Sequence, residues 1–279
     1  MALHAEMGLS AAERDVGWIL TCARSATSDV LLEVEDLGGV QLIAAHTWPC
    51  RIQALEKLAS DVLRVVLRLP PTSDFNFYPG QYIDLIGPGG VRRSYSVANA
   101  PRADKLVDLH IRKVPGGALS AYWFGAAKIN DLLRLHGPLG TFFLRASAGI
   151  HLAFLATGTG IAPVKAMLEG LAGLPQESRP ASVTVYWGGR TAVDLYWDSA
   201  RVGLAHRFVP VLSRAGDEWC GVRGHVQQAL LANAPDLACT HVYACGSAAM
   251  IHGARAALCA AGLPEHHFHS DAFVCSAPA

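Results

Sequence analysis

The pattern of apolar segments changes near Gly149, and this change limits the folds that the chain can adopt. Beyond that point, short apolar segments of strand length alternate with longer segments of helical periodicity. The expected strands are Leu152–Ala156, Val183–Trp187, Phe208–Leu212, His241–Ala244 and His267–Phe273. The expected helices are Pro163–Gly173, Leu195–Val202, Val226–Asn233 and Ala248–Ala261. This alternation predicts a parallel sheet with helices on both faces.

The preceding hundred residues have a different pattern, with short strands separated by turn residues. Pro115-Gly116-Gly117 opens one expected helix, which runs through Phe124. Several short strands at this spacing predict a six-stranded Greek-key barrel. We therefore expect a β plus α/β chain with an N-terminal segment at 1–45, a barrel at 46–147 and a parallel-sheet domain at 148–279. The expected barrel strands are Cys50–Leu58, Val62–Leu69, Gln81–Ile86, Arg92–Asn99, Val107–Val114 and Leu132–His136.

Composition excludes several classes of protein. The 279 residues are 51% hydrophobic and 16% charged, which is typical of a packed globular protein. Lys and Arg balance Asp and Glu at 23 each, so no basic excess predicts binding to nucleic acid. No apolar run is long enough to cross a membrane, and the first residues lack a signal-peptide pattern. The seven cysteines are odd in number and include no Cys-x-x-Cys pair. We therefore expect reduced thiols, no zinc or cluster site and a cytoplasmic location.

The segment Arg92–Asn99 carries a cation and an aromatic ring on one face of its expected strand. Arg93, Tyr95 and Val97 are each two residues apart, so their side chains point the same way. The arginine fork suits a phosphate, and the tyrosine could stack on a flat ring system with its hydroxyl left free. An ordinary Arg/Tyr pair on an exposed strand is the alternative.

Two glycine-rich segments lie at expected helix starts. Gly116-Gly117 precedes a helix that contains Ser120, and Gly158-Thr159-Gly160 follows the strand Leu152–Ala156. Glycines let a phosphate approach the backbone, and the free N–H groups of a helix start attract it. The second segment has the context of a dinucleotide-binding loop, although Pro163 stands near the place of the usual third glycine. For the first segment, a turn with ordinary capping is the alternative.

Four segments resemble, in the same order, those of the ferredoxin–NADP reductase superfamily. They are Arg93-Ser94-Tyr95-Ser96, Pro115-Gly116-Gly117 with Ser120, Gly158–Pro163, and Cys245-Gly246-Ser247. The resemblance covers about residues 46–279. In detail the chain resembles bacterial reductases that pass electrons from a nicotinamide to a [2Fe-2S] centre, such as oxygenase reductase components and reductases of CDP-6-deoxyhexose dehydratases. The resemblance implies a flavin-binding barrel followed by a Rossmann-like nicotinamide-binding domain.

The resemblance assigns the FAD contacts to the barrel. Ser96 would hydrogen-bond near the flavin N5. Strict alternation turns Ser96 away from Tyr95, so the strand must bend or the contact must run through the backbone. His110 and Arg112 would touch the ribityl or adenosine part. The expected FAD contacts are Arg93, Tyr95, Ser96, Val97, His110, Arg112, Gly116, Gly117, Ala118 and Ser120.

The nicotinamide contacts are expected after the parallel strands. By resemblance, Cys245 would lie beside the nicotinamide carbon that gives up the hydride, and the alternative is a small buried thiol. Arg190 or Arg214 could meet a 2′-phosphate and favour NADPH, whereas Asp194 resembles the NADH-using reductases. NADH is therefore the expected donor. The expected contacts are Thr157, Gly158, Thr159, Gly160, Arg190, Asp194, Arg214, Cys245 and Gly246.

The segment Ser270–Phe273 resembles the acidic and aromatic ending of the family. Phe273 would cover the second face of the flavin, and Asp271 would orient a polar group near the hydride path. Together with Ser96 and Cys245 they form the expected catalytic set.

One nearby cluster suggests a metal at first sight. Adjacent histidines on a surface turn are more often solvated, so no metal site is expected. The cluster consists of Glu265, His266, His267 and His269.

The N-terminal segment resembles the last strands of a plant-type ferredoxin domain. Those strands would be Gly17–Cys22 and Ser28–Glu33, and Cys22 would be the fourth cluster ligand. A cluster of this type needs three earlier cysteines in a Cys-x4-Cys-x2-Cys run, and Cys22 is the first cysteine here. We expect a remnant of that domain and no [2Fe-2S] cluster. A plain hairpin with a buried Cys22 is the alternative.

The expected function is an FAD-dependent NAD(P)H reductase that passes electrons to a ferredoxin or an oxygenase-type acceptor protein. The alternatives are a non-catalytic FAD- or nucleotide-binding module and a reductase of free flavin. The Arg93, Tyr95, Ser96 and Cys245 set argues against the first alternative. The glycine-rich phosphate site at Gly117 and Ser120 argues against the second.

Overall fold

A computed structural model describes residues 9, 11–32, 34, 37, 39–145, 147–233 and 235–273, and only the backbone of residues 12 and 22. The chain divides into two compact units, residues 1–40 and 41–279. No helix among the described residues is long and apolar enough to cross a membrane. The predicted boundaries at 45/46 and 147/148 stay predictions.

The N-terminal unit contains a short helix, α1 (Ala11–Asp15), and a 3-10 turn at Thr21–Ala23. Neither 17–22 nor the described part of 28–33 belongs to a strand, so the predicted ferredoxin-type strands were wrong, and so was the hairpin alternative. The apolar run that suggested a strand is not buried, because Leu31 is 100% exposed. The side chain of Cys22 lies outside the described residues.

The larger unit begins with the predicted six-stranded antiparallel sheet. Its strand order is β4-β3-β6-β1-β2-β5, and a bridge between Val97 and Leu109 joins the two edge strands into a barrel. The helix at the glycine-rich segment starts later than predicted: α2 (Ala118–Ala121) continues into a π-helical turn at Tyr122–Ala126. The strands are β1 (His46–Ala59), β2 (Val62–Arg68), β3 (Tyr82–Ile86), β4 (Arg92–Ser96), β5 (Leu106–Arg112) and β6 (Leu132–Leu139).

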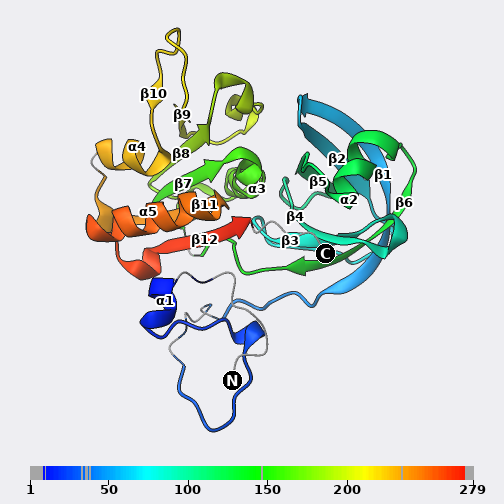
Figure 1. Cartoon of the computed structure of the whole chain (residues 1–279), viewed down its shortest axis with the longest axis horizontal. Coiled ribbons are helices and arrows are strands. Elements are labelled where there is room, and N and C mark those ends of the chain that lie inside the picture. The colour runs from blue at the N-terminus through cyan, green and yellow to red at the C-terminus, as the bar shows by residue number, and fades with distance from the viewer. Residues whose placement is uncertain are drawn as a thin grey trace. The chain divides into compact units, whose positions relative to one another are not determined.

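The second sheet is parallel and has the order β10-β9-β8-β7-β11-β12 (Figure 1). The order reverses between β7 and β11, and ligands of such sheets bind at the carboxyl ends of the strands at this switch point. Five strands were predicted; the sixth, β10, has only two residues and no apolar run to signal it. The strands are β7 (His151–Thr157), β8 (Ser182–Gly189), β9 (Arg207–Leu212), β10 (Val222–Arg223), β11 (Thr240–Ser247) and β12 (Phe268–Phe273).

Helices cover both faces of the parallel sheet, as predicted. α3 (Ile161–Ala172) packs into one apolar core, whereas α4 (Val226–Ala232) and α5 (Ala248–Ala260) pack into the core on the other face. The predicted helix at Leu195–Val202 was wrong. Residues 195–198 form neither a helix nor a strand, and a 3-10 turn follows at Ser199–Arg201. Three consecutive apolar side chains pack there against the α3 core, and consecutive residues cannot share one helix face. They are Leu195, Tyr196 and Trp197.

Candidate functional site

β4 presents Tyr95 half-buried against the barrel core. Trp123 Nε1 donates a hydrogen bond to the Tyr95 hydroxyl at 3.2 Å, so the prediction that this hydroxyl is free was wrong. Arg93 is exposed, and its Nη1 donates to the Arg92 carbonyl at 2.7 Å. Ser96 is buried and pairs in register with Tyr82. β4 therefore offers an aromatic ring and an accessible cation close together.

The glycine-rich segment before α2 is open on one side. Gly116 has a φ of +73° and no atom within 4 Å of the position that a Cβ would occupy. Val114 N–H donates to Ser120 Oγ at 2.7 Å, which leaves the Ser120 hydroxyl proton available to another acceptor. Gly117 is the residue before α2, and Ala118 is its first residue. The segment can therefore admit an anionic group to the backbone.

On β5, the predicted contacts His110 and Arg112 lie on the same face, which meets the α/β part. The Tyr196 hydroxyl and His110 Nδ1 are 3.3 Å apart, and the two rings form an edge-to-face pair at 5.5 Å. Burial, reinforced by the charge of Lys165, lowers the pKa of His110 to about 3. His110 is therefore neutral near pH 7. Tyr196 was missed in the sequence because it falls in the segment that was assigned to a helix.

The Arg112 guanidinium lies against the loop after β7. A Cβ on Gly158 would be 3.0 Å from Arg112 Nη1. The guanidinium is 3.4 Å from an Asp61 carboxylate oxygen and 3.9 Å from one of Asp194. Its Nε and Nη2 are nevertheless shielded and form no hydrogen bond. The side chain as a whole is 29% exposed, so these two shielded donors without hydrogen bonds are candidates for pairing with a phosphate of a bound nucleotide.

The loops that follow β7 and β11 interlock at the switch point. Gly158 has a φ of +56°, and its carbonyl accepts a hydrogen bond from Trp187 Nε1 at 3.0 Å. A Cβ on Gly160 would be 2.2 Å from the Cys245 carbonyl oxygen. Ser247 N–H donates to Thr157 Oγ1 at 3.2 Å. Sequence reasoning missed Trp187, although its place before Gly188-Gly189 at a strand end was a usable signal.

Cys245 and Asp271 are neighbours across β11 and β12. Cys245 is 0% exposed, and burial raises the pKa of its thiol well above the ordinary value. Burial also raises the pKa of Asp271 to about 6. Its charge, after burial and Asp84, helps to raise the pKa of Tyr82 on the barrel strand β3. Asp271 therefore lies beside Cys245, its charge acts on the barrel strand β3, and Phe273 follows at 36% exposure.

The three residues predicted to select the nucleotide meet after β8 and β9. Arg214 N–H donates to the Arg190 carbonyl at 2.8 Å. Asp194 Oδ2 accepts the N–H groups of Arg190 and Thr191, while its Oδ1 is 3.2 Å from Arg190 Nη2. Burial opposes ionisation of Asp194, but these hydrogen bonds outweigh it and lower its pKa. Asp194 therefore holds its own turn and partners Arg190.

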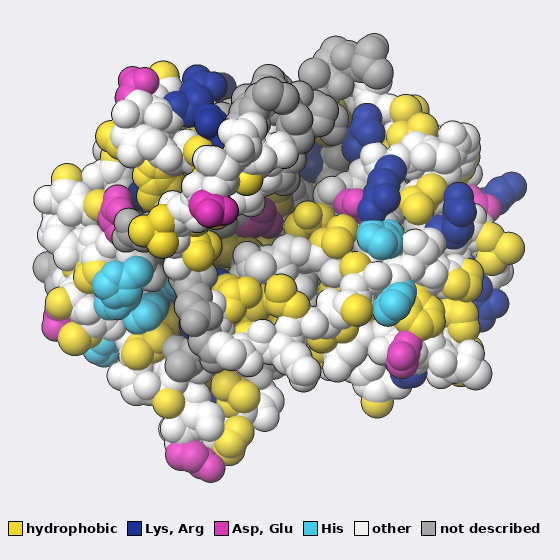
Figure 2. All heavy atoms as spheres, turned by 90° about the horizontal axis from the view of Figure 1, so that it is seen from below, with side chains coloured by type: hydrophobic (Ala, Val, Ile, Leu, Met, Phe, Trp, Pro, Cys, Tyr) yellow, Lys and Arg dark blue, Asp and Glu magenta, His cyan; other side chains and the backbone are white. Residues whose placement is uncertain are grey.

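A histidine stack lies on β11 and the segment that leads into β12. The His241 and His267 rings are parallel at 3.9 Å, and His269 stacks on Tyr243 at 4.6 Å. Histidine side chains gather on the α/β side of the face in Figure 2. Among the described residues, no group of three His, Cys, Asp or Glu side chains could hold a metal ion.

Comparison with known proteins agrees with this arrangement. The Oxidoreductase FAD-binding domain matches residues 49–144, and the Oxidoreductase NAD-binding domain matches residues 154–256. The CDP-6-deoxy-L-threo-D-glycero-4-hexulose-3-dehydrase reductase of Yersinia pestis is 43% identical over 268 residues, 94% of this chain and 80% of that protein. The reductase component of the Mycolicibacterium smegmatis propane 2-monooxygenase is 30% identical over 98% of this chain and 82% of its own length.

Two solved structures are similar in fold and sequence. An Amycolatopsis cytochrome P450 reductase is 31% identical with a TM-score of 0.75, covering 95% of this chain and 81% of that one. The ferredoxin reductase of a carbazole 1,9a-dioxygenase is 26% identical with a TM-score of 0.76, covering 87% and 74%. The chain therefore belongs to the ferredoxin reductase-type family of FAD- and NAD-binding flavoprotein oxidoreductases, whose members include reductase components that supply electrons to iron–sulfur proteins and oxygenases.

Proposed function

We propose that this enzyme takes hydride from NADH at the switch point of its parallel sheet and delivers electrons through FAD to a separate iron–sulfur protein or oxygenase. The observation that carries the proposal is the position of Arg112, a barrel residue whose Nε and Nη2 form no hydrogen bond and whose guanidinium lies against the dinucleotide loop at Gly158. When bound, FAD accepts a hydride and releases electrons one at a time. The names of the related reductases support the type of acceptor.

The barrel residues would hold the FAD and shield it. Tyr95 would support the flavin ring, while Ser96 and Val97 would line the same strand. Arg93 and Arg112 would meet the phosphates, together with the open backbone of the segment that begins at Gly116. His110, neutral and hydrogen-bonded, would form an uncharged wall beside the ribityl chain. Further phosphate contacts are proposed for Gly117, Ala118 and Ser120.

The nicotinamide half would be held by the interlocked loops after β7 and β11. The segment Thr157–Gly160 would face the pyrophosphate, and Cys245 with Gly246 would form the wall next to the nicotinamide ring. Asp271, with a pKa near 6, would hold or release a proton close to the hydride path. Phe273 would exclude water from the second flavin face.

We propose NADH as the preferred donor. The Arg190 guanidinium is 60% exposed but is already paired with Asp194, which reduces its capacity to bind a 2′-phosphate. Arg214 is exposed and would be the main cation left for NADPH. The test compares flavin reduction by the two nucleotides under single-turnover conditions. A higher ratio of the limiting reduction rate to the half-saturating concentration with NADPH would contradict the proposal.

We also propose one FAD and no [2Fe-2S] cluster in these 279 residues, because Cys22 has no earlier cysteine beside it. Flavin, iron and sulfide analysis of the purified protein decides the point, and stoichiometric iron would contradict it. Flavin that co-elutes with the protein separates bound FAD from the free-flavin alternative. Reduction of that flavin by NADH separates an enzyme from a non-catalytic module. A cytoplasmic location is proposed from free thiols such as Cys50 and Cys245.

A further inference from the structure

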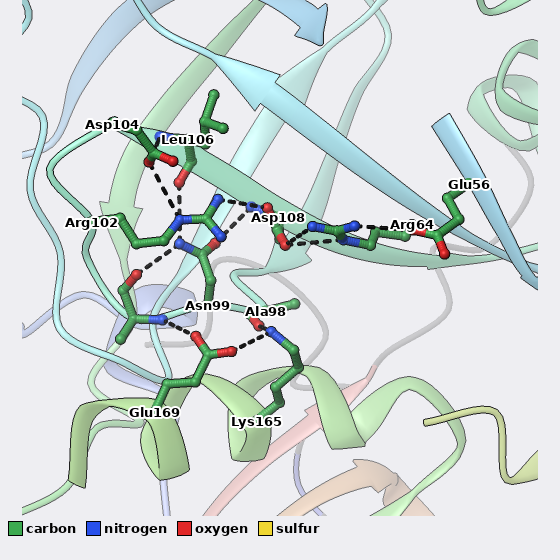
Figure 3. Close-up of polar contacts among 11 residues, drawn as sticks. Glu56, Arg64, Ala98, Asn99, Arg102, Asp104, Leu106, Asp108, Lys165 and Glu169 are labelled. Carbon is green, nitrogen blue, oxygen red and sulfur yellow. Dashed lines mark hydrogen bonds and ion pairs between the residues drawn. The ribbon is translucent and has the colours of Figure 1, made fainter. Parts of the chain in front are cut away.

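Two charged side chains of α3 contact the barrel backbone. Lys165 Nζ donates to the Ala98 carbonyl at 2.7 Å and to Glu169 Oε1 at 2.6 Å. Glu169 Oε2 accepts the N–H of Ala100 at 3.0 Å. Figure 3 shows both side chains pointing from the helix toward the loop between β4 and β5. α3 thus offers one donor and one acceptor to backbone groups two residues apart.

The loop that receives these contacts is fixed to the rest of the barrel (Figure 3). Asn99 is 0% exposed, and its Oδ1 accepts the N–H of Asp108 at 2.6 Å. Its Nδ2 donates to the carbonyl groups of Ala100 at 2.7 Å and of Leu106, the first residue of β5, at 3.1 Å. The Asp108 carboxylate is held by Arg64 at 2.8 Å and by Arg102 at 2.9 Å. The loop is therefore held to β5 through Asn99 and Asp108 and to β2 through Arg64, so it is expected to move together with the barrel.

Both ends of the contact lead directly to the proposed cofactor sites. Ala98 comes two residues after Ser96, the last residue of β4. Lys165 is in the second turn of α3, which begins right after Gly158–Gly160. A Cβ on Gly170 would be 3.0 Å from a Pro79 ring carbon, so the helix and the barrel are in close contact here as well. The contact therefore links two proposed cofactor sites through few residues. They are β4, which we call the flavin strand, and Gly158–Gly160, which we call the nicotinamide loop.

The chemistry of this contact suits a rigid connection. Each bond has a charged partner, and charge-assisted hydrogen bonds are shorter and stronger than neutral ones. The Lys165 side chain is 15% exposed and that of Glu169 is 31% exposed, so water screens the pair only in part. Loss of either partner leaves the other without its counter-charge, so we expect either substitution to weaken both contacts. Hydride transfer needs reacting atoms about 3–3.5 Å apart, and a displacement of about 1 Å can cost a hundredfold in rate.

We propose that Lys165 and Glu169 form an interdomain latch that sets the nicotinamide loop at the correct position against the flavin strand. Both are positioning residues, because they bind the backbone of the barrel and not the reacting atoms. The inference rests on the proposed transfer of hydride from NADH to FAD. It adds the residues that keep the two half-sites in register.

The test uses Lys165→Met and Glu169→Gln in the full-length chain with FAD bound. Stopped-flow reduction at saturating NADH should slow roughly tenfold to a hundredfold. Flavin content and the NADH concentration at half-saturation should change less than about twofold, because no nucleotide contact is lost. Lys165→Arg, which keeps the charge, should restore part of the rate. Hydrogen exchange of the Ala100 amide, measured without NADH, should be faster in Glu169→Gln, since that amide loses its charged acceptor.

Glu56→Gln is the matched control. It removes a carboxylate that pairs with Arg64 at 3.0 Å at the far end of the same network, entirely within the barrel, so the rate should not change. A faster exchange of Ala100 with an unchanged reduction rate would overturn the positioning role. Unchanged exchange in both variants would show that the latch does not form. If NADH fails to reduce even the wild-type flavin, the proposed function fails first.

Discussion

At the scale of single residues, Tyr95 combines a half-buried ring with a hydroxyl that is bonded to Trp123. Tyr95→Ala should weaken FAD retention, because stacking of a base on an aromatic side chain contributes on the order of 1–3 kcal/mol. That corresponds to a rise of roughly 5- to 150-fold in the dissociation constant of FAD, measured by titration of the apoprotein. Tyr95→Phe keeps the ring and should retain FAD within a few-fold. An equal loss in both variants would show that the hydrogen bond to Trp123, not the ring, is what matters.

Cys245 makes a second prediction at this scale. Its side chain is fully buried at the end of β11, beside the Gly158–Gly160 loop. Cys245→Ala should slow reduction of the bound flavin by NADH, because the loss of the sulfur loosens the wall beside the nicotinamide. Cys50→Ala is the control, since Cys50 is also a buried thiol, in the barrel core. Both should cost about 1 kcal/mol of stability. A reduction rate that is the same in both variants, with full flavin content, would make Cys245 a packing residue only.

Some residue-level predictions could not be settled from the sequence. The sequence places Tyr95 and Asp194 in the right segments, but it does not show their partners. Trp123 is 28 positions away from Tyr95 and reaches it only through the fold of the barrel. Asp194 was expected to mark an NADH site by resemblance, and its carboxylate is used by the turn that carries it. Polar residues serve local structure and ligands with the same atoms, so residue type alone does not separate the two roles.

At the scale of elements, the loop after β7 depends on a residue without a side chain. A Cβ on Gly160 would be 2.2 Å from the Cys245 carbonyl oxygen and 3.0 Å from Gly246 Cα, and backbone atoms cannot turn aside. Gly160→Ala should therefore destabilise the protein by about 3 kcal/mol or more. Gly125→Ala is the control, since nothing lies within 4 Å of its Cβ position, and it should be neutral or slightly stabilising. Thermal unfolding of the two variants measures the difference, and equal melting temperatures would contradict it.

The histidine stack at the β11–β12 edge predicts a pH dependence. Burial first, and then the nearby histidines, lower the pKa values of His241 and His267 below the ordinary value of 6.5. The unfolded chain therefore binds protons that the folded chain refuses. The contribution of the histidine stack to the free energy of unfolding is complete above about pH 6.5. It is lost as the pH falls toward the lowered pKa values of His241 and His267.

His267→Gln should reduce this acid sensitivity in denaturant unfolding curves recorded from pH 7.5 to about pH 5. His252→Gln, on an exposed position of α5, should leave the curve unchanged. Asp271 acts in the opposite direction. Its pKa is raised from 3.8 to about 6, so its burial costs stability as the pH rises through that window. The comparison must therefore be made between variants and not on the wild type alone. Identical slopes for His267→Gln and wild type would contradict the assignment.

Elements with a clear period were predictable, and elements set by distant packing were not. The barrel strands and α3, α4 and α5 follow their apolar patterns to within a few residues. The stretch 195–198 has a helix-like composition, but its aromatic rings pack in the core beside Trp187, so it forms no helix. The segment 17–22 has a strand-like composition but does not pair as one. In the stretch 195–198 tertiary contacts decided the structure, as propensity alone cannot.

At the scale of the whole molecule, the barrel and the parallel sheet share one compact unit, 41–279. This unit should unfold in a single transition, because the contacts between the two sheets are polar and shielded as well as apolar. FAD at a hundred times its dissociation constant should raise its stability by about 2.7 kcal/mol. Scanning calorimetry with and without FAD tests both statements. Two separated transitions in the wild-type protein would contradict the first.

The type of both sheets was predictable because it depends on local pattern, whereas the side-chain contacts between them were not. The strands, the antiparallel or parallel type of each sheet and the glycine loops after strands follow from short-range signals, whereas the order of the strands was not predicted. The contacts of Lys165 and His110 across the boundary join residues 67 and 86 positions apart. These contacts are made by single residues that belong to no recognisable sequence motif, so the sequence did not predict them.

β5 has a consequence for the exchange of parts between related reductases. Leu109 and Ile111 point into the barrel, while His110 and Arg112, the residues in between, meet Tyr196 and Gly158 on the other side. One strand thus contributes to the core of the barrel with one face and to the contact with the α/β part with the other. A chimera joined between the barrel and the α/β part would take His110 and Arg112 from one parent and their contact partners, Tyr196 and Gly158, from the other. An active chimera should instead take β5 and the stretch from β7 to Tyr196 from the same parent, because the residues on both sides of this contact must match one another.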